Sequence, residues 1–508
     1  MDNWDLVVIG AGSAGAVIAA RVTEDPAQRV LLIEAGPDYP DAQSLPEDLT
    51  DGHKNSLVKH DWGFVYQPTP VVRSDVPLPR GKVTGGSSAV NTSIALRGQR
   101  EDYDEWAAIA GPEWSWEKCL PAFKRLETDR DITNALHGCD GPIPLRRYPR
   151  DELVPFQRAF LDACRAMGYP ECPDHNDPDT TGYGPHPMNK QGRLRVSTNL
   201  AYLNPARSRP NLTIRPKTNV RRVIVRDGRA TGVEVETDGV VETIDAARIV
   251  LCGGAIQSPN ILVRSGIGPK ETLERLGVPV VKDAHGVGAR LWDHPGSMVV
   301  MVPMPGIAAY DQPMIQTTLR YTAKGSDELN DMQLEPISFI QRLDDDGPLL
   351  CGLAAVIEKP RGHGRLRFES ADPNAQPAIE SEFLKDDWDV ERMVEGIEIG
   401  LRMAETVEMR EVCQLVVRPQ HEVAIDREKL ATWVKRRCGS GYHPSGTAPM
   451  GAADDEDAVL DQYGHVYGIE GLFVADASIM PTIPRANTNI PTIMIGERFG
   501  EWFREGVC

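Results

Sequence analysis

The chain opens with short apolar runs separated by polar turns, a pattern typical of parallel strands joined by helices. Residues 5–9 and 30–33 are apolar runs of strand length, and residues 14–23 between them carry a helical pattern. A strand, a helix and a second strand form the unit from which parallel sheets are built. The N-terminal part is therefore predicted to be an α/β domain.

Further apolar runs later in the chain predict more strands and helices of the same domain. Strands are expected at 211–214, 220–226, 232–237, 249–251 and 472–474, with a hairpin turn at 227–228. Helices are expected at 114–127, 155–167 and 490–503, and another after 254 that ends near 265. Residues 170–189 are rich in proline, glycine and aspartate and predict a long loop; whether it is a lid stays open.

The pattern changes between residues 296 and 439. Strand-like runs occur at 298–302, 316–321, 352–358 and 364–368, and residues 387–408 have the apolar stripe of an amphipathic helix. We therefore predict a second domain of a sheet plus helices, inserted between pieces of the first. The expected division places 1–150, 190–295 and 440–508 in one domain, and 151–189 and 296–439 in the other.

Three glycines follow the first strand directly, and an acid follows the second. Gly10 permits a tight turn, Gly12 lets a pyrophosphate approach the backbone, and Gly15 lets helix and strand pack closely. The helix N-terminus offers free N–H groups to phosphates, and Glu34 can accept hydrogen bonds from a ribose 2′-OH. This combination predicts a dinucleotide site. An acid at Glu34 disfavours the 2′-phosphate of NADP, while FAD and NAD both stay open.

Composition narrows the class of protein. The 508 residues are 41% hydrophobic and carry a net charge of −19, which argues against nucleic acid and anionic membrane as partners. No run of 18 apolar residues exists, so no membrane span is expected, and the early glycine motif leaves no room for a signal peptide. The nine cysteines are scattered, which fits a reducing cytoplasm. The acidic stretch 174–179 lacks the glycine and glutamate of a calcium loop, so no metal site is predicted.

A second glycine-rich stretch, residues 80–93, resembles the first signature of the glucose–methanol–choline (GMC) oxidoreductases, as does its continuation at 97–106. Residues 252–259 resemble the second signature, and 442–451 the catalytic histidine motif, with Ala448 replacing the usual cysteine. The resemblance implies a Rossmann-type FAD domain interleaved with a substrate domain, and oxidation of an alcohol. The FAD-binding positions that it implies are Gly10, Gly12, Ser13, Ala14, Gly15, Glu34, Ala35, Gly81, Lys82, Gly85, Gly86, Ser87, Asn91, Thr92, Ser93, Val220, Gly254, Tyr442, Asp476, Ala477, Thr488 and Pro491.

The resemblance also implies the chemistry. His443 falls on the family's catalytic histidine and Asn487 on its second catalytic position, with His363 as the next candidate for a base. Pro491 suits a helix first turn with Asn489 as its N-cap, and that helix end would place positive dipole near flavin N1. Some members attach the flavin through a histidine just before the asparagine of the first signature. Here that position is Val90, so FAD is expected to bind without a covalent bond.

Three other functions remain as alternatives. A hydroxynitrile lyase can use the same fold without net redox chemistry, a flavin-binding regulator would lack catalysis, and an NAD-dependent dehydrogenase is the weakest alternative. The expected substrate is a primary alcohol whose identity the sequence does not give. Oxygen or a quinone-like compound would accept the electrons, and the oligomeric state stays open.

Overall fold

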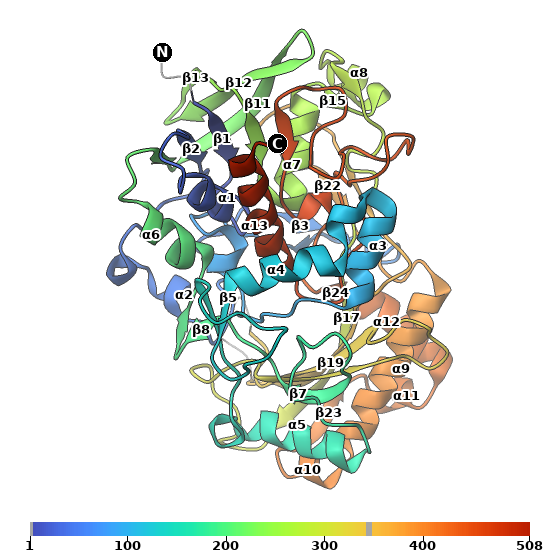
Figure 1. Ribbon diagram of the computed structural model, residues 1–508. Helices are drawn as coiled ribbons and strands as arrows, with labels where there is room; N and C mark the ends of the chain where they lie inside the picture. Colours follow the sequence, from blue (N-terminus) through green and yellow to red (C-terminus); the bar gives the residue numbers. More distant parts are fainter. Residues whose placement is uncertain (1–3, 342–347) are drawn as a thin grey trace.

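The computed structural model describes residues 4–341 and 348–508, and the two largest sheets of this part of the chain lie one above the other (Figure 1). The upper sheet in this view is parallel and has the strand order β10-β2-β1-β14-β25. Its strands are β1 (Leu6–Ile9), β2 (Val30–Ile33), β10 (Leu212–Arg215), β14 (Ile249–Leu251) and β25 (Leu472–Val474). All five predicted strands of this sheet are present, and three of them are wholly buried apolar runs in the centre, as parallel strands covered on both faces should be.

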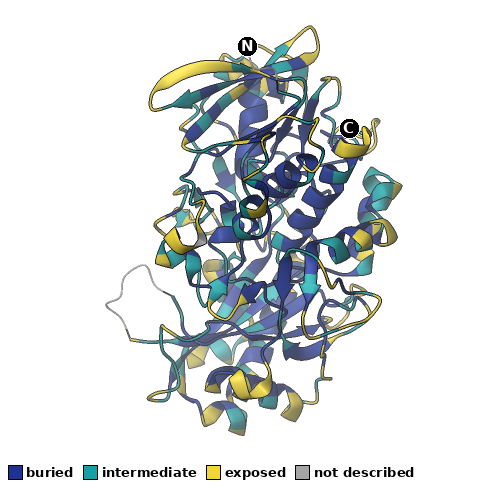
Figure 2. Ribbon diagram, turned by 60° about the vertical axis from the view of Figure 1, so that its left-hand side comes forward, coloured by how far each residue is buried: buried dark blue, intermediate teal, exposed yellow. Residues whose placement is uncertain are grey.

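Helices cover this parallel sheet. Helix α1 (Gly15–Val22) packs against α13 (Asn489–Glu505), which in turn contacts α4 (Trp116–Leu126). Helix α7 (Gly254–Arg264) follows β14 and contacts β11 (Thr218–Arg226). Strand β11 pairs with β12 (Arg229–Thr237), which pairs with β13 (Val240–Asp245). The outer edge of this small sheet is exposed, whereas α13 is largely buried (Figure 2).

The lower sheet is antiparallel, in the order β23-β17-β20-β19-β18-β7, with a short strand β24 paired to β17. Its strands are β7 (Gly182–Pro185), β17 (Pro295–Pro303), β18 (Thr317–Tyr321), β19 (Met332–Ile337), β20 (Cys351–Ile357), β23 (Cys413–Arg418) and β24 (Gly439–Ser440). Helices α5 (Pro155–Ala166) and α9 (Asp387–Ala404) pack against it. The strands of this sheet therefore come from a stretch of the sequence more than 250 residues long.

Several expectations need correction here. The segment 170–189 is not only loop, because β7 at its end pairs with β18. The helix expected over 387–408 stops at Ala404, and a separate short helix, α10, spans Val407–Arg410. Strands β13, β19 and β23 were not predicted. In β19 the signal is weakened by Pro336, which lies beyond the ladder with β18 that ends at Leu334. The strand expected at 364–368 forms, as β21 (Arg365–Arg367), in a separate two-stranded sheet with β22 (Ala378–Glu380).

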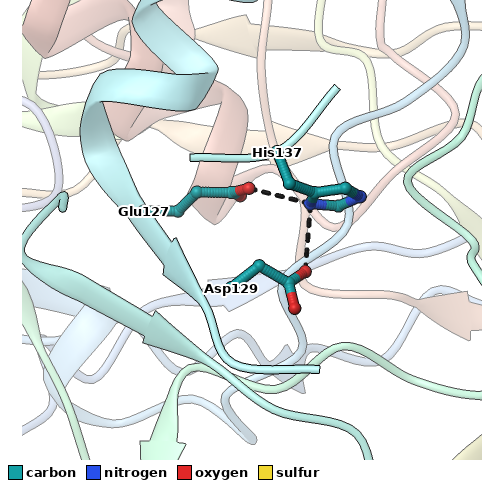
Figure 3. A group of neighbouring side chains, drawn as sticks. All are labelled: Glu127, Asp129 and His137. Atoms are coloured by element: carbon teal, nitrogen blue, oxygen red, sulfur yellow. Dashed lines mark hydrogen bonds and ion pairs between the residues drawn. The ribbon is translucent and has the colours of Figure 1, made fainter. Parts of the chain in front are cut away.

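A buried charge cluster joins the segment after α4 to Asp174 of the 170–189 segment, and Figure 3 shows three of its members, Glu127, Asp129 and His137. His137 Nδ1 lies 2.9 Å from Glu127 Oε1 and 3.0 Å from Asp129 Oδ2, and its Nε2 lies 2.8 Å from Asp174 Oδ2. Arg147 pairs with both aspartates at 2.8 Å, and Arg97 pairs with Glu127. Three carboxylates thus face two guanidinium groups and one imidazole. Because each carboxylate is already paired with a guanidinium group or the imidazole, we interpret the group as an ion-pair cluster.

The charge cluster predicts a stability effect at His137. Burial alone disfavours the charged imidazole, but hydrogen bonds to Asp129, Asp174 and Glu127 raise its pKa from 6.5 to about 10. The imidazolium therefore contributes stability that is fully present below about pH 6.5 and is lost as pH rises through about 10. His137→Gln should lower the free energy of unfolding by about 3–5 kcal/mol near neutral pH, because it leaves buried carboxylates unpaired.

Urea unfolding at pH 7 and pH 10 measures this effect, and the difference from wild type should shrink at the higher pH. His285→Gln is the matched control, since His285 is an exposed histidine 3.6 Å from Asp283. A His137→Gln protein as stable as the control would contradict the charged state.

No helix in the described ranges 4–341 and 348–508 is both long and apolar enough to cross a membrane. All nine cysteines carry free thiols.

Candidate active site

A cavity of about 570 Å³ lies between the two sheets. On one side it is lined by the carboxyl ends of β1, β2 and β14 and the turns that follow them, and on the other by β17, β19 and β20. The carboxyl edge of an open parallel sheet is where such folds bind nucleotide cofactors. The cavity therefore has one wall suited to a cofactor and another wall available to a substrate.

Most of the predicted site residues line this one cavity. They are Gly10, Gly12, Ser13, Ala14, Glu34, Ala35, Gly81, Gly86, Ser87, Asn91, Thr92, Val220, Gly254, Tyr442, His443, Asp476, Ala477, Asn487 and Thr488. The predicted positions that do not line it are Gly15, Lys82, Gly85, Ser93 and Pro491. Lys82 instead places its ammonium 4.6 Å from the ring centre of Trp62, and Ser93 is fully buried.

The glycines of the first turn have different roles. A Cβ atom at Gly15 would lie 2.0 Å from the carbonyl oxygen of Gly10, so this position serves the packing of α1 on the turn. A Cβ at Gly12 would meet only Gly86, at 3.8 Å, and Gly12 lines the cavity. Space beside Gly12 at the N-terminus of α1 fits a pyrophosphate that approaches the backbone.

Glu34 stands at the end of β2, as expected for a ribose acceptor. Its carboxylate accepts hydrogen bonds from the backbone N–H of Ala11 at 2.9 Å and of Gly36 at 2.8 Å. Burial raises its pKa to about 7, against the opposing effect of these two bonds. The carboxyl group is thus held at the cavity wall in one orientation, which fits binding of a ribose hydroxyl.

The N-terminus of α13 meets the N-terminus of α1 at the cavity. Ser13 Oγ donates to Asn489 Oδ1 at 2.8 Å, and Asn489 Nδ2 is buried without a hydrogen-bond partner among the described residues. The prediction of Asn489 as N-cap is wrong by one position: Thr488 precedes the helix, and Asn489 is its first residue. Two helix N-termini and an unused amide donor at one point fit an anionic, oxygen-rich group such as the diphosphate and flavin of FAD.

Asp476 lines the cavity, but its carboxylate is occupied within the protein. It accepts from the backbone N–H of Gly254 at 2.8 Å and from Ser258 Oγ at 2.5 Å, which joins the end of β25 to the start of α7. Burial raises the pKa of this carboxyl. Asp476 therefore shapes the wall beside a cofactor through its own backbone.

The two predicted catalytic residues lie together on the cavity wall. His443 Nε2 is 3.1 Å from Asn487 Nδ2, and His443 Nδ1 is 2.9 Å from Nδ1 of a second histidine, His294. Burial lowers the pKa of His443 well below 6.5, and the charges of His294 and Arg80 act in the same direction. His443 is therefore a neutral base at pH 7. The alternative base, His363, does not line the cavity and bonds the carbonyl of Gly364.

Asp293 keeps the two histidines side by side. Its Oδ1 accepts from the backbone N–H of His294 at 2.8 Å and of His443 at 2.9 Å, and its Oδ2 accepts from Ser440. Pairing of β24 with the start of β17, Ser440 opposite Pro295, brings these distant segments together. Tyr442 has a positive φ of 66°, a conformation rare for a residue other than glycine, immediately before His443.

The substrate wall is one face of the antiparallel sheet. Side chains alternate along the strands, so Gln333, Glu335 and Ile337 of β19 line the cavity together with Ala354, Val356 and Glu358 on β20 and just after it. The intervening Leu334, Leu353 and Ala355 face α9. This wall carries two carboxylates. Glu335 accepts from His186 and Gln333, at 3.1 and 3.3 Å.

Sequence reasoning missed Asp293, His294 and Glu358 as site residues. The predicted domain boundary lies between residues 295 and 296, and the Asp-His pair just before that boundary was a usable signal. Glu358 carries no local signal, since a glutamate at the end of a strand is usually exposed.

Comparisons with known proteins agree with this arrangement. The model for "GMC oxidoreductase" matches residues 4–296, and its C-terminal counterpart matches residues 360–496. An oxygen-dependent choline dehydrogenase of Chromohalobacter salexigens is 37% identical over 99% of this chain and 95% of its own length. A 5-(hydroxymethyl)furfural oxidase of Methylovorus sp. is 33% identical over 98% of both chains.

A solved structure shows the same fold over the full chain. Pyridoxine 4-oxidase from Mesorbium loti superposes with a TM-score of 0.91 and 27% identity, covering 99% of each chain. Together with the family models, which span most of the sequence, these likenesses show that the chain belongs to the GMC oxidoreductase family, FAD-dependent enzymes that act on CH–OH donors.

Proposed function

We propose that the protein oxidises a primary alcohol to the aldehyde, with His443 as general base and Asn487 as its partner on the substrate oxygen. The observation that carries this proposal is the pair itself: His443 Nε2 and Asn487 Nδ2 lie 3.1 Å apart on the wall of the cavity. A hydroxyl that contacts both groups in place of their direct hydrogen bond would give its proton to the imidazole and accept from the amide. A positioned base contributes roughly 10²–10⁴ in rate.

The rest of the cavity would orient the substrate and provide an electrostatic field at the cofactor. FAD, when bound, provides the electron sink that takes the hydride from the carbinol carbon. Asn487 would orient the substrate oxygen so that the C–H bond points away from the wall that carries His443. Residues at the N-terminus of α13 would place positive dipole beside the cofactor, at no reorganisation cost.

The two sheets support the domain division proposed from the sequence. Every strand of the parallel sheet falls within 1–150, 190–295 or 440–508. All the longer strands of the antiparallel sheet fall within 151–189 or 296–439, with β17 starting at the boundary. We assign FAD binding to the first set and substrate binding to the second.

Electrons would pass on to oxygen or a quinone-like acceptor. The relatives described above include an oxygen-dependent dehydrogenase and an oxidase by name, which supports oxygen as the acceptor. Cyanohydrin cleavage, the non-redox alternative, has no counterpart among the relatives compared above.

The test is anaerobic mixing of the purified yellow protein with a panel of primary alcohols, followed by addition of oxygen or an artificial acceptor. Bleaching of the flavin absorption by at least one alcohol is expected. A protein that converts a cyanohydrin while its flavin stays oxidised would be a lyase instead.

Attachment of the cofactor gives a separate prediction. Val90 lines the cavity and is 7% exposed, and its side chain offers no nucleophile to the flavin ring. Acid precipitation should therefore release all of the yellow colour into the supernatant. Val90→His is the informative variant, since it restores a nucleophile at this position. Flavin that stays in the pellet of the wild-type protein would contradict non-covalent binding.

A further inference from the structure

We propose that His294 and Glu358 extend the base into a three-member chain, in which the proton taken up at His443 leaves its positive charge on His294, opposite the Glu358 carboxylate. The inference rests on the proposed role of His443 and adds two positioning residues to it. His294 bridges the other two: its Nδ1 is 2.9 Å from His443 Nδ1, and its Nε2 is 3.8 Å from Glu358 Oε2.

Hydrogen bonding determines which nitrogen of each ring carries a proton. His294 Nε2 lies 3.1 Å from the carbonyl oxygen of Pro484, which can only accept, so this nitrogen is protonated. In a neutral ring the other nitrogen, Nδ1, then has a lone pair and accepts from His443 Nδ1. His443 must therefore hold its proton on Nδ1. Its Nε2 then carries the lone pair of the base, which accepts from Asn487 Nδ2 at 3.1 Å on the cavity wall.

Glu358 has a buried carboxylate oxygen without a hydrogen bond. The residue is 3% exposed, and its Oε2 has no hydrogen-bond partner within the described parts of the chain. Burying a charge in this way is costly unless a positive charge stands opposite. The His443–His294 pair gains such a charge when it takes a proton from the substrate.

Other charged groups around the pair are already engaged. Arg320, whose charge interacts with Glu358, directs its two terminal nitrogens to the backbone carbonyls of His175 and Arg485. Asp293 uses both carboxylate oxygens on Ser440 and the two histidine backbones. The positive charge of Arg80 disfavours the charged form of His443. A charge that moves from His443 to His294 reaches a ring whose Nε2 lies 3.8 Å from the Glu358 carboxylate.

The proton transfer balances at each atom. The substrate O–H bond breaks and an N–H bond forms at His443 Nε2. The N–H bond at His443 Nδ1 breaks and one forms at His294 Nδ1. His443 ends neutral with its proton on Nε2, and His294 becomes an imidazolium beside the Glu358 carboxylate. The alkoxide keeps the electron pair and loses the hydride in the oxidation proposed above.

The experiment uses the flavin-loaded enzyme and anaerobic stopped-flow reduction. The single variants are Glu358→Gln, Glu358→Asp and His294→Asn. The double variant combines Glu358→Gln with His294→Asn. Asparagine at 294 keeps an oxygen to accept from His443 Nδ1 but cannot take its proton. Glu335→Gln is the matched control, because it removes the other carboxylate of the same wall, whose partners are His186 and Gln333. Substrates are benzyl alcohol, choline and its neutral isostere 3,3-dimethylbutan-1-ol.

Glu358→Gln should lower the limiting rate of reduction about tenfold, by the same factor for choline and its neutral isostere, with unchanged alcohol affinity. The acid limb of the rate, read by pH jump to avoid acid unfolding, should move about one unit lower, because a facing carboxylate no longer favours the charged form. The resting flavin spectrum, titrated without substrate, should show the same shift. The rate and the acid limb of Glu358→Asp should fall between those of the wild type and Glu358→Gln. The acid limb of Glu335→Gln should match that of the wild type.

The most decisive result is whether the rate losses of Glu358→Gln and His294→Asn add up in the double variant. Because Glu358 acts through His294, the double variant should be no slower than His294→Asn alone. Additive losses, an unmoved acid limb, or a loss confined to choline would overturn the proposal, the last by making Glu358 a binding group for a cationic substrate. A wild-type enzyme reduced by no alcohol would overturn the proposed function, and the proton chain with it.

Discussion

Replacing His443 by alanine should slow anaerobic flavin reduction by at least roughly 10²-fold while leaving FAD bound and the fold intact. The imidazole is half-buried on the cavity wall, and its ring contacts are His294 and Asn487 rather than the apolar core. The loss should appear in the limiting rate, because the base acts on a hydroxyl that water does not deprotonate at neutral pH.

The wild-type rate should also depend on pH in a defined direction. Burial and the neighbouring His294 and Arg80 lower the pKa of His443 well below 6.5, so the free base is present throughout the neutral range. Reduction should therefore be constant around pH 7 and fall only in acid, below the ordinary histidine pKa. His443→Ala should lose that acid limb.

Two controls accompany this measurement. Asn487→Ala should lose less than His443→Ala, because one hydrogen bond of about 1–3 kcal/mol is removed and the base remains. His363→Ala should reduce at the wild-type rate, since this histidine lies outside the cavity wall. Near-normal reduction by His443→Ala would show that another group is the base.

Gly12→Val should yield a folded protein that has lost its flavin. Among the described residues, apart from the chain neighbours of Gly12, only Gly86 stands within 4 Å of a Cβ at this position. The protein itself therefore accommodates the side chain, which projects where a pyrophosphate would approach. Losing two charge-assisted hydrogen bonds of about 1.5–3 kcal/mol each should weaken FAD binding by at least roughly 10²-fold. The ratio of flavin to protein absorbance and a titration with added FAD measure this.

Gly15→Val is the contrasting variant. Its Cβ would lie 2.0 Å from the Gly10 carbonyl and 2.9 Å from the Cys252 side chain, so the first turn could not form. Gly12→Val should thus keep a cooperative unfolding transition, whereas Gly15→Val should not fold. Full flavin content in purified Gly12→Val would place the pyrophosphate elsewhere.

Local sequence patterns determined the parallel sheet and the positions of the residues at its edge. Continuous apolar runs at 6–9, 30–33 and 249–251 are typical of buried strands. Between the first two, a Cβ at Gly10 or Gly15 would clash with nearby backbone. These are properties of neighbouring residues, which is why the parallel sheet and the position of Glu34 were predictable. The resemblance to known signatures then led to His443 and Asn487, which the fold brings within 3.1 Å.

The tertiary structure decided what lies between distant segments. Strand β19 contains Pro336, which cannot donate a backbone hydrogen bond, and it forms because β20 and β18 pair with it on either side. Cluster partners His137 and Asp174 meet only when two loops fold together. His294 and His443 become neighbours through the pairing of β24 with β17, and Glu358 joins them from the end of a third strand. Strand pairing brings these charged residues together from separate segments. No periodic pattern in the sequence marks them, because the residues next to each of them in the sequence have other roles.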